Sequence, residues 1–215
     1  MTAPHTTSYG QRAFLVLQSI FHLLLAIFIT STIWFLAYNW SWNNLRTWHV
    51  FLCNIGISLF MAEGIALFNP GNAFIYGSSR KFRGTLHGIF MGLGALAVIV
   101  GVSMMINYKI SNNRTHLTTP HAIIGITTFI ITFLAAIGGI FIHFYDRFNI
   151  KPVYVKNCHF ILGILVYVLG VITLSLGLKN YFYENSDATN TGLIVILVLA
   201  SIINVSGPLK SLFKL

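Results

Sequence analysis

Six long apolar stretches dominate this sequence and limit what it can fold into. A helix that crosses a bilayer needs about 20 mostly apolar residues, and six stretches meet that requirement: roughly 13–38, 47–68, 85–107, 119–144, 155–178 and 190–208. The composition agrees, because 56% of the residues are hydrophobic and 8% are charged, against roughly 25% charged in an average soluble domain. We therefore predict an all-α membrane protein of six transmembrane helices, surrounded by the lipid bilayer.

The connections between these stretches are short, so no separate soluble domain is expected. We predict a tail at 1–12, one six-helix transmembrane domain at 13–208 and a second tail at 209–215. The first apolar run exceeds the roughly 7–15 apolar residues of a cleaved signal peptide. It is therefore interpreted as the first transmembrane helix.

The basic residues indicate how the helices are oriented. Six crossings place both termini on one side of the membrane, which carries nine Lys and Arg residues: Arg12, Arg80, Lys81, Arg83, Arg147, Lys151, Lys156, Lys210 and Lys214. The opposite side carries four: Arg46, Lys109, Arg114 and Lys179. Because cytosolic loops carry the excess of positive charge, we predict that both termini are cytosolic. The basic residues lie in short loops, where they indicate topology, so we predict no nucleic-acid-binding surface. We expect an endomembrane location, in the endoplasmic reticulum or a vesicle, ahead of the plasma membrane.

Four histidines lie near the ends of four consecutive apolar stretches. They are His49, His87, His121 and His159, and their successive separations are 38, 34 and 38 residues. Because consecutive helices enter from opposite sides, His49 and His121 share the outer level, and His87 and His159 the cytosolic level. The repeated separation of 38 residues suggests an internal duplication about an axis along the membrane normal, which would bring the equivalent histidines face to face.

Imidazoles inside a bilayer are costly unless something binds them. Two imidazoles that approach one iron from opposite sides give a six-coordinate haem that passes electrons. We therefore predict two haem b groups in a four-helix core formed by the second to fifth stretches, one between His49 and His121 and the other between His87 and His159. The alternative is a six-span transporter or structural membrane protein whose histidines bind neighbouring helices instead of a metal.

Glycines follow three of these histidines at helical spacing. Gly125 and Gly163 each lie four residues after a histidine, and Gly56 lies seven residues after His49. One interpretation is that these glycines leave room for a flat macrocycle. The alternative for each glycine is close packing of two transmembrane helices.

Glu63 is the only acidic residue inside a predicted span. One hypothesis is that its carboxylate binds a ligand histidine or handles a proton that is coupled to reduction; the alternative is a carboxylate that reaches the cytosolic interface. His143 is the rival candidate for an inner ligand. His22 and His5 are predicted to have no partner at a matching depth.

The order and depth of these four histidines resemble the cytochrome b561 family. Local stretches add to the resemblance, which covers nearly the whole chain: Thr47-Trp48-His49, Met61-Ala62-Glu63 and His116-Leu117-Thr118-Thr119-Pro120-His121. They are most similar to small b561-domain proteins without an appended domain. The resemblance implies an ascorbate-dependent transmembrane oxidoreductase that passes electrons through two haem b groups. Its implied donor is cytosolic ascorbate, its implied acceptor is monodehydroascorbate or a ferric chelate, and a homodimer is an open option.

One segment departs from the best-known family members. Where they carry an Arg-containing motif associated with ascorbate, this chain has Ala66-Leu67-Phe68-Asn69-Pro70-Gly71. The candidates for contacts with an anionic donor or with haem propionates are instead Arg80, Lys81 and Arg83 beside His87. On the outer side the candidate is His116, five residues before His121.

Overall fold

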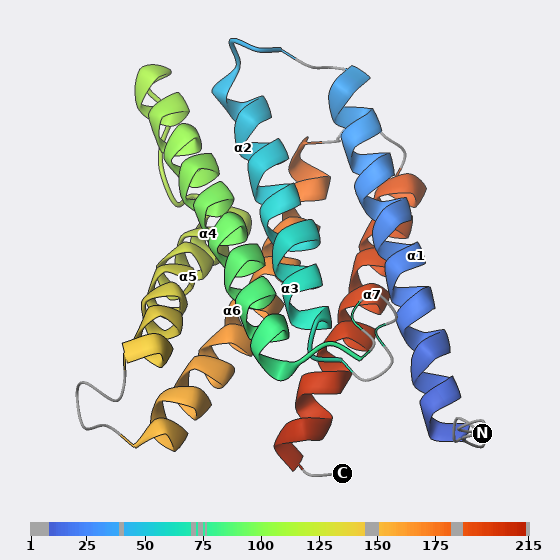
Figure 1. Ribbon diagram of the computed structural model, residues 1–215. Coiled ribbons are helices and arrows are strands. Elements are labelled where there is room, and N and C mark those ends of the chain that lie inside the picture. The colour runs from blue at the N-terminus through green and yellow to red at the C-terminus, as the bar shows by residue number, and fades with distance from the viewer. Residues whose placement is uncertain are drawn as a thin grey trace, which may run out of the picture.

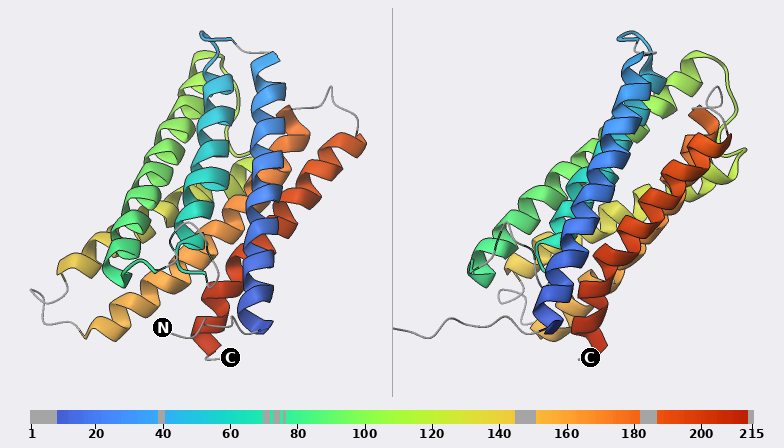
Figure 2. Two further views of the ribbon diagram at one scale, coloured as in Figure 1. Left: turned by 45° about the vertical axis from the view of Figure 1, so that its right-hand side comes forward. Right: turned by 90° about the vertical axis from the view of Figure 1, so that its right-hand side faces the viewer.

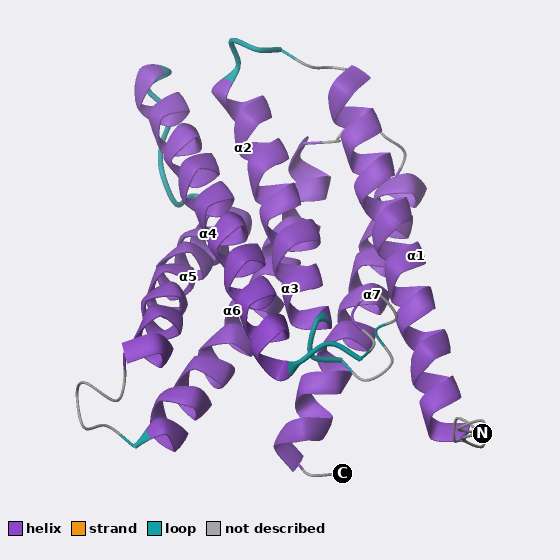
Figure 3. Ribbon diagram, in the orientation of Figure 1, coloured by secondary structure: helices purple, strands orange, loops and turns teal. Residues whose placement is uncertain are grey.

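The chain folds into a bundle of long helices (Figures 1 and 3). Its structure is a computed structural model that describes residues 9–38, 41–69, 72, 75, 77–144, 151–181 and 187–213. The elements are α1 (Tyr9–Tyr38), α2 (Leu45–Asn54), η1 (Ile55–Met61), α3 (Ala62–Ala66), α4 (Arg80–Ser111), α5 (Pro120–Phe144), α6 (Pro152–Tyr181) and α7 (Asp187–Phe213). Within the described ranges, six helical segments are long and apolar enough to cross a membrane. The prediction of an all-α protein with six transmembrane helices is confirmed.

The second span is built from three consecutive elements. α2, α3 and the π-helical segment η1 between them form the single apolar segment Leu45–Ala66. Its first turn is capped by Asn44, whose side chain accepts a hydrogen bond from the backbone N–H of Arg46 at 3.0 Å. A side-chain acceptor at this position satisfies a backbone donor that has no partner within the helix.

The third span starts earlier and ends later than its apolar stretch. α4 begins at Arg80 and ends at Ser111, whereas the predicted stretch covered 85–107. The Ser79 hydroxyl accepts a hydrogen bond from the N–H of Phe82 and so fixes the start of the helix. Hydropathy marks the part of a helix in lipid, while its ends are set by caps.

Packing separates a core of two helical hairpins from an outer helix pair. α4 packs against α2 and η1, α5 packs against α6, and α1 packs against α7. Figures 1 and 2 show α1 beginning and α7 ending at the same end of the bundle, with α4 and α5 on the side away from α1. The first and sixth spans therefore lie outside the hairpins that carry the four histidines.

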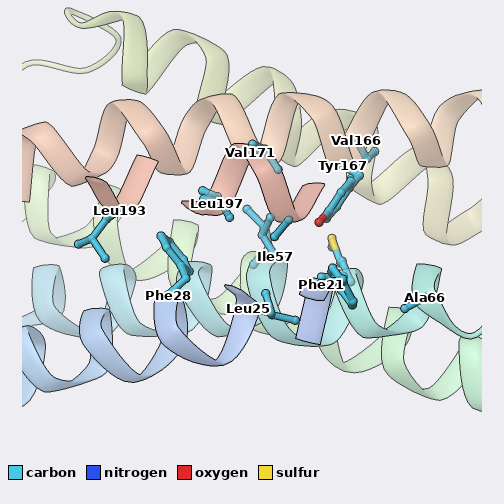
Figure 4. Packing of buried hydrophobic residues seen from close by; sticks show 14 of the residues in the cluster. Phe21, Leu25, Phe28, Ile57, Ala66, Val166, Tyr167, Val171, Leu193 and Leu197 are labelled. Atoms are coloured by element: carbon cyan, nitrogen blue, oxygen red, sulfur yellow. The ribbon is translucent and has the colours of Figure 1, made fainter. Parts of the chain in front are cut away.

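Buried apolar side chains join the outer pair to the core. The cluster includes Phe21, Leu25 and Phe28 of α1, Ile57 of η1, Tyr167 and Val171 of α6, and Leu193 and Leu197 of α7 (Figure 4).

A buried amide fixes the position of α7 against α3. Asn204 is 0% exposed, and its Nδ2 donates to the carbonyl oxygen of Ala62 at 2.8 Å. Asn69 Nδ2 donates to the backbone carbonyl oxygen of Asn204 at 2.9 Å. Because unpaired amides are costly in an apolar interior, these bonds select one register of α7.

Candidate functional site

The outer histidines face each other across the two hairpins. His49 comes from α2 and His121 from the first turn of α5, and their ring centroids are 6.2 Å apart with ring planes at 82°. His49 Nδ1 donates to the carbonyl oxygen of Gly101 at 3.0 Å, and His121 Nδ1 donates to that of Thr173 at 3.0 Å. Since Nδ1 carries the proton in both rings, each neutral imidazole keeps its Nε2 lone pair for a ligand.

The inner histidines repeat this arrangement nearer the other end of the bundle. The rings of His87 (α4) and His159 (α6) have centroids 6.2 Å apart and planes at 86°. His87 Nδ1 donates to the carbonyl oxygen of Gly64 at 2.9 Å, and His159 Nδ1 donates to that of Ala135 at 3.2 Å. The structure thus brings the four histidines together in the two predicted couples.

These couples fit two axial ligands of one metal porphyrin. With a metal–imidazole bond of about 2 Å on each side and about 1 Å from nitrogen to ring centre, two axial imidazoles have centroids about 6 Å apart. Within each couple the two ring centroids are 6.2 Å apart. Metal-binding histidines usually donate their second ring N–H to a carbonyl or carboxylate, as all four do here. A histidine with a purely structural role could donate the same Nδ1–H bond to a neighbouring helix. That role uses only one of the two ring nitrogens.

A bare metal ion fits the described residues less well. In that part of the chain no three His, Cys, Asp or Glu side chains form a group that could hold a metal ion. A haem needs only two protein ligands, because the porphyrin supplies the other four nitrogens. Each facing couple supplies the two protein ligands that a haem would need.

A cavity of about 340 Å³ surrounds the outer couple. His49 and His121 both line it, together with apolar side chains such as Val98, Met105 and Leu174. Apolar walls that end in two opposed imidazoles can enclose the face of a macrocycle while its polar edge remains near the membrane surface.

The glycines predicted to make room for a macrocycle have different surroundings. Gly125 lines the outer cavity, and a Cβ at Gly163 would have no heavy atom within 4 Å. Gly56 fits the alternative of close helix packing. A Cβ there would lie 3.1 Å from the carbonyl oxygen of Gly94, so Gly56 allows η1 and α4 to pack closely.

Two other glycines lie directly against rings of the facing histidines. A Cβ at Gly177 would be 3.0 Å from His121 Cε1, and one at Gly139 would be 3.2 Å from His159 Cε1. The spacing between histidines and glycines on one helix could not reveal them, because Gly177 belongs to α6 and Gly139 to α5, each the partner helix of the ring it contacts.

The carbonyl partners show that the two hairpins are related, with one difference. In both, the outer histidine and its carbonyl partner are 52 residues apart. The inner histidine and its partner are 23 residues apart in the first hairpin and 24 in the second. The π-helical segment η1 explains this difference, since a π-turn accommodates one extra residue. The π-turn keeps both His49 and the Gly64 carbonyl oxygen facing the core.

Basic side chains line the outer cavity near its histidines. His116 lies on its wall, and it is joined by Arg46, Lys109 and Arg114. The neighbouring Leu117 has φ +54°, a conformation that is rare and costly for a residue with a Cβ. The loop of His116 is further attached to α4, because Lys109 Nζ donates to the Thr115 carbonyl oxygen at 2.9 Å.

The inner basic residues lie at the start of α4. Arg83 Nε donates to Ser78 Oγ and its Nη2 to the Ser78 carbonyl oxygen, both at 3.2 Å. Arg80 and Lys81 are exposed. All three precede His87 by seven residues or fewer, and Arg83 is the one already engaged in fixing the loop before α4.

Glu63 binds a histidine from the first helix. Its Oε1 lies 3.1 Å from His22 Nδ1, so the prediction that His22 has no partner at its depth is wrong. The contact of Glu63 is with this histidine and not with one of the four facing histidines. The side chain of His143 and the whole of His5 fall outside the described residues.

Comparison with known proteins agrees with this geometry. Residues 48–184, which include all four facing histidines, match the family model of eukaryotic cytochrome b561. The chain is 26% identical over 182 residues to the probable transmembrane reductase CYB561D1 of Mus musculus, covering 84% of this chain and 77% of that protein. It is 28% identical over 151 residues to the transmembrane reductase CYB561D2 of Mus musculus, covering 70% of this chain and 67% of that protein.

Proposed function

Because the chain belongs to the cytochrome b561 family, we propose that it is a transmembrane reductase which carries electrons through two haem b groups. His49 and His121 hold the outer group, and His87 and His159 hold the inner one. The observation that supports this most strongly is the pair of imidazole couples, each with centroids 6.2 Å apart and each ring oriented by a backbone carbonyl. One relative is named a transmembrane reductase and another a probable one, which supports reduction as the reaction of this chain.

A haem with two imidazole ligands supplies a one-electron site that has no coordination position open to oxygen. The protein contributes orientation and insulation. The Nδ1–H bonds to Gly101, Gly64, Thr173 and Ala135 hold the rings in one tautomer. A fixed tautomer leaves the lone pair of each Nε2, on the side of the ring away from its carbonyl partner, to bind a haem iron when one is present.

Ascorbate is the proposed cytosolic donor. It is an anion, and Arg80, Lys81 and Arg83 gather positive charge a few residues before His87. Positive charge raises the local concentration of an anion and the rate of its encounter with the protein. The two exposed residues, Arg80 and Lys81, are the better candidates for contact, because Arg83 already binds Ser78.

Monodehydroascorbate or a ferric chelate is the proposed outer acceptor. Arg46, Lys109, Arg114 and His116 line the cavity around the outer couple. Their charge suits an anionic acceptor or the propionates of a haem, and His116 can donate a hydrogen bond or bind iron.

This direction of flow requires cytosolic termini, which the excess of Lys and Arg on that side supports. An epitope inserted between Asn112 and Asn113 should then bind antibody only from the non-cytosolic side. We further propose an endomembrane location.

Reduction across sealed vesicles tests the proposal. Purified protein is reconstituted in proteoliposomes loaded with ferric citrate and a ferrous indicator, and ascorbate is added outside. We expect ferrous iron to appear inside with wild-type protein and to be lost in both His49→Ala and His87→Ala proteins, because each interrupts the path. Formation of ferrous iron at the rate of protein-free vesicles would contradict the proposal.

A further inference from the structure

A second cavity of about 580 Å³ lies between α1, η1, α3 and the start of α4. Its volume is within the range of roughly 300–1,000 Å³ that is usual for small-molecule sites. Its described lining residues differ from those of the outer cavity. It is therefore a separate site, on the side of α3 and α4 that faces α1.

Two titratable side chains meet on the wall of this cavity. His22 Nδ1 and Glu63 Oε1 are 3.1 Å apart, and the side chains are 21% and 23% exposed. Both side chains line the cavity. The cavity therefore offers a carboxylate and an imidazole as hydrogen-bonding groups to a molecule that enters from the membrane.

The remaining walls are mainly apolar and partly aromatic. They are formed by Ala26 and Ile29 of α1, Leu59 of η1, and Phe82 and Phe90 of α4. Such walls favour a ring with alkyl substituents over a hydrated solute. The carboxylate of Glu63 disfavours an anion, so ascorbate and fatty acids suit this cavity poorly.

The cavity also adjoins the inner couple. Glu63 directly precedes Gly64, whose carbonyl oxygen accepts the bond from His87 Nδ1. Leu86, the residue before His87, is part of the cavity wall. A molecule bound here would lie close to the peptide whose carbonyl oxygen accepts the bond from His87.

We propose that this cavity binds a lipid-phase hydroquinone, whose ring lies between α1 and α4 and whose hydroxyl donates a hydrogen bond to the Glu63 carboxylate. The His22 imidazole holds that carboxylate in position. The site is distinct from the aqueous donor site proposed near Arg80 and Lys81. It requires only the cavity and the His22–Glu63 pair, and does not depend on transmembrane reduction.

Equilibrium binding tests the proposal. The probes are a radiolabelled hydroquinone with a decyl side chain and its di-O-methyl ether, measured on the full chain in nanodiscs and corrected with empty nanodiscs. We expect saturable binding of the hydroquinone and at least tenfold weaker binding of the ether, which has no hydroxyl to donate. Glu63→Leu should weaken hydroquinone binding at least tenfold.

A second variant covers the case in which Glu63→Leu does not fold. Ala26→Phe fills the cavity from α1 and leaves both titratable groups in place, and it should abolish binding. Asp187→Asn, which removes an acidic group at the start of α7, is the matched control and should bind as wild type. The haem spectrum of each sample reports separately on the four histidines.

Four results would overturn the proposal. They are absence of saturable binding to wild type, equal binding of the ether, unchanged binding to a folded Glu63→Leu protein, and unchanged binding to Ala26→Phe. A protein that transfers electrons and shows any of these results lacks the site, while a colourless protein that passes the binding test retains it.

Discussion

Each of the four facing histidines lies opposite another histidine ring, which distinguishes them from His22 and His116 among the histidines whose side chains the structure describes. Replacing His49 or His121 with Ala should remove the outer haem, and replacing His87 or His159 the inner one, since a single axial imidazole no longer holds the group from both sides. Each variant should keep about half of the pigment per chain, measured by haem extraction and by the reduced-minus-oxidised spectrum.

His116→Ala is the matched control, because His116 lines the same cavity without facing another histidine. It should retain both haems. Loss of the inner group in a His143→Ala protein, with His159→Ala unaffected, would show that the inner couple is assigned wrongly.

Gly177 tests the fit of the outer ring. The Cβ of a Gly177→Ala protein would lie 3.0 Å from His121 Cε1, so the ring must move and its bond to Thr173 must lengthen. Disturbing such an outer-shell partner typically weakens metal affinity by about 10–100-fold. We expect faster loss of the outer haem in a dissociation assay with apomyoglobin, while the inner haem is retained.

Gly192→Ala is the control for this substitution, because a Cβ there would have no heavy atom within 4 Å. Equal rates of haem loss from the Gly177→Ala and Gly192→Ala proteins would contradict a close fit of the His121 ring.

The residues that form couples could be predicted from the sequence, because depth in the membrane follows from position in an apolar stretch. Their hydrogen-bond partners could not. Gly101 and Thr173 accept through backbone carbonyls, which carry no signal of residue type. The partner of Glu63 was missed for another reason: His22 lies in the first helix, and its approach to η1 and α3 depends on how the outer pair packs.

Among the elements, η1 makes a prediction of its own. The second hairpin joins its outer histidine and inner carbonyl through the regular helix α5, with one residue fewer than the first. Deleting Leu59 should therefore convert η1 into a regular α-helix and keep both haems, at a cost in stability on the order of 1–2 kcal/mol.

Deleting Phe129 from α5 is the comparison, because no π-turn there accommodates the change. It should rotate His121 relative to the Ala135 carbonyl oxygen, which binds His159, so that the two no longer face the core together, and it should reduce haem content. Retention of both haems after the Phe129 deletion, or loss of the inner haem after the Leu59 deletion, would refute this account of η1.

All six membrane-spanning elements could be predicted from the sequence, but the π-helical segment η1 within the second one could not. Apolar length identifies a span, and Leu45–Ala66 remains apolar throughout η1. A single extra residue leaves no mark in hydropathy. The backbone of Ile55–Met61 in three dimensions reveals it.

For the whole molecule, buried amides link the outer helices to the core. Asn204→Leu removes the bond to the Ala62 carbonyl oxygen and should lower the free energy of unfolding by about 0.5–2 kcal/mol, as is typical of hydrogen bonds between membrane helices. Thr127→Val, whose exposed hydroxyl bonds only within its own helix, should have little effect. Unfolding in mixed micelles monitored by circular dichroism measures both, and equal stabilities would argue against the role of Asn204.

The haem content of the purified protein tests the central claim most directly. Extraction as the pyridine complex, together with a reduced-minus-oxidised spectrum, gives the number and type of groups per chain. We expect two haem b groups with the spectrum of a low-spin, bis-imidazole iron. A colourless protein without stoichiometric iron would contradict the assignment of the four histidines.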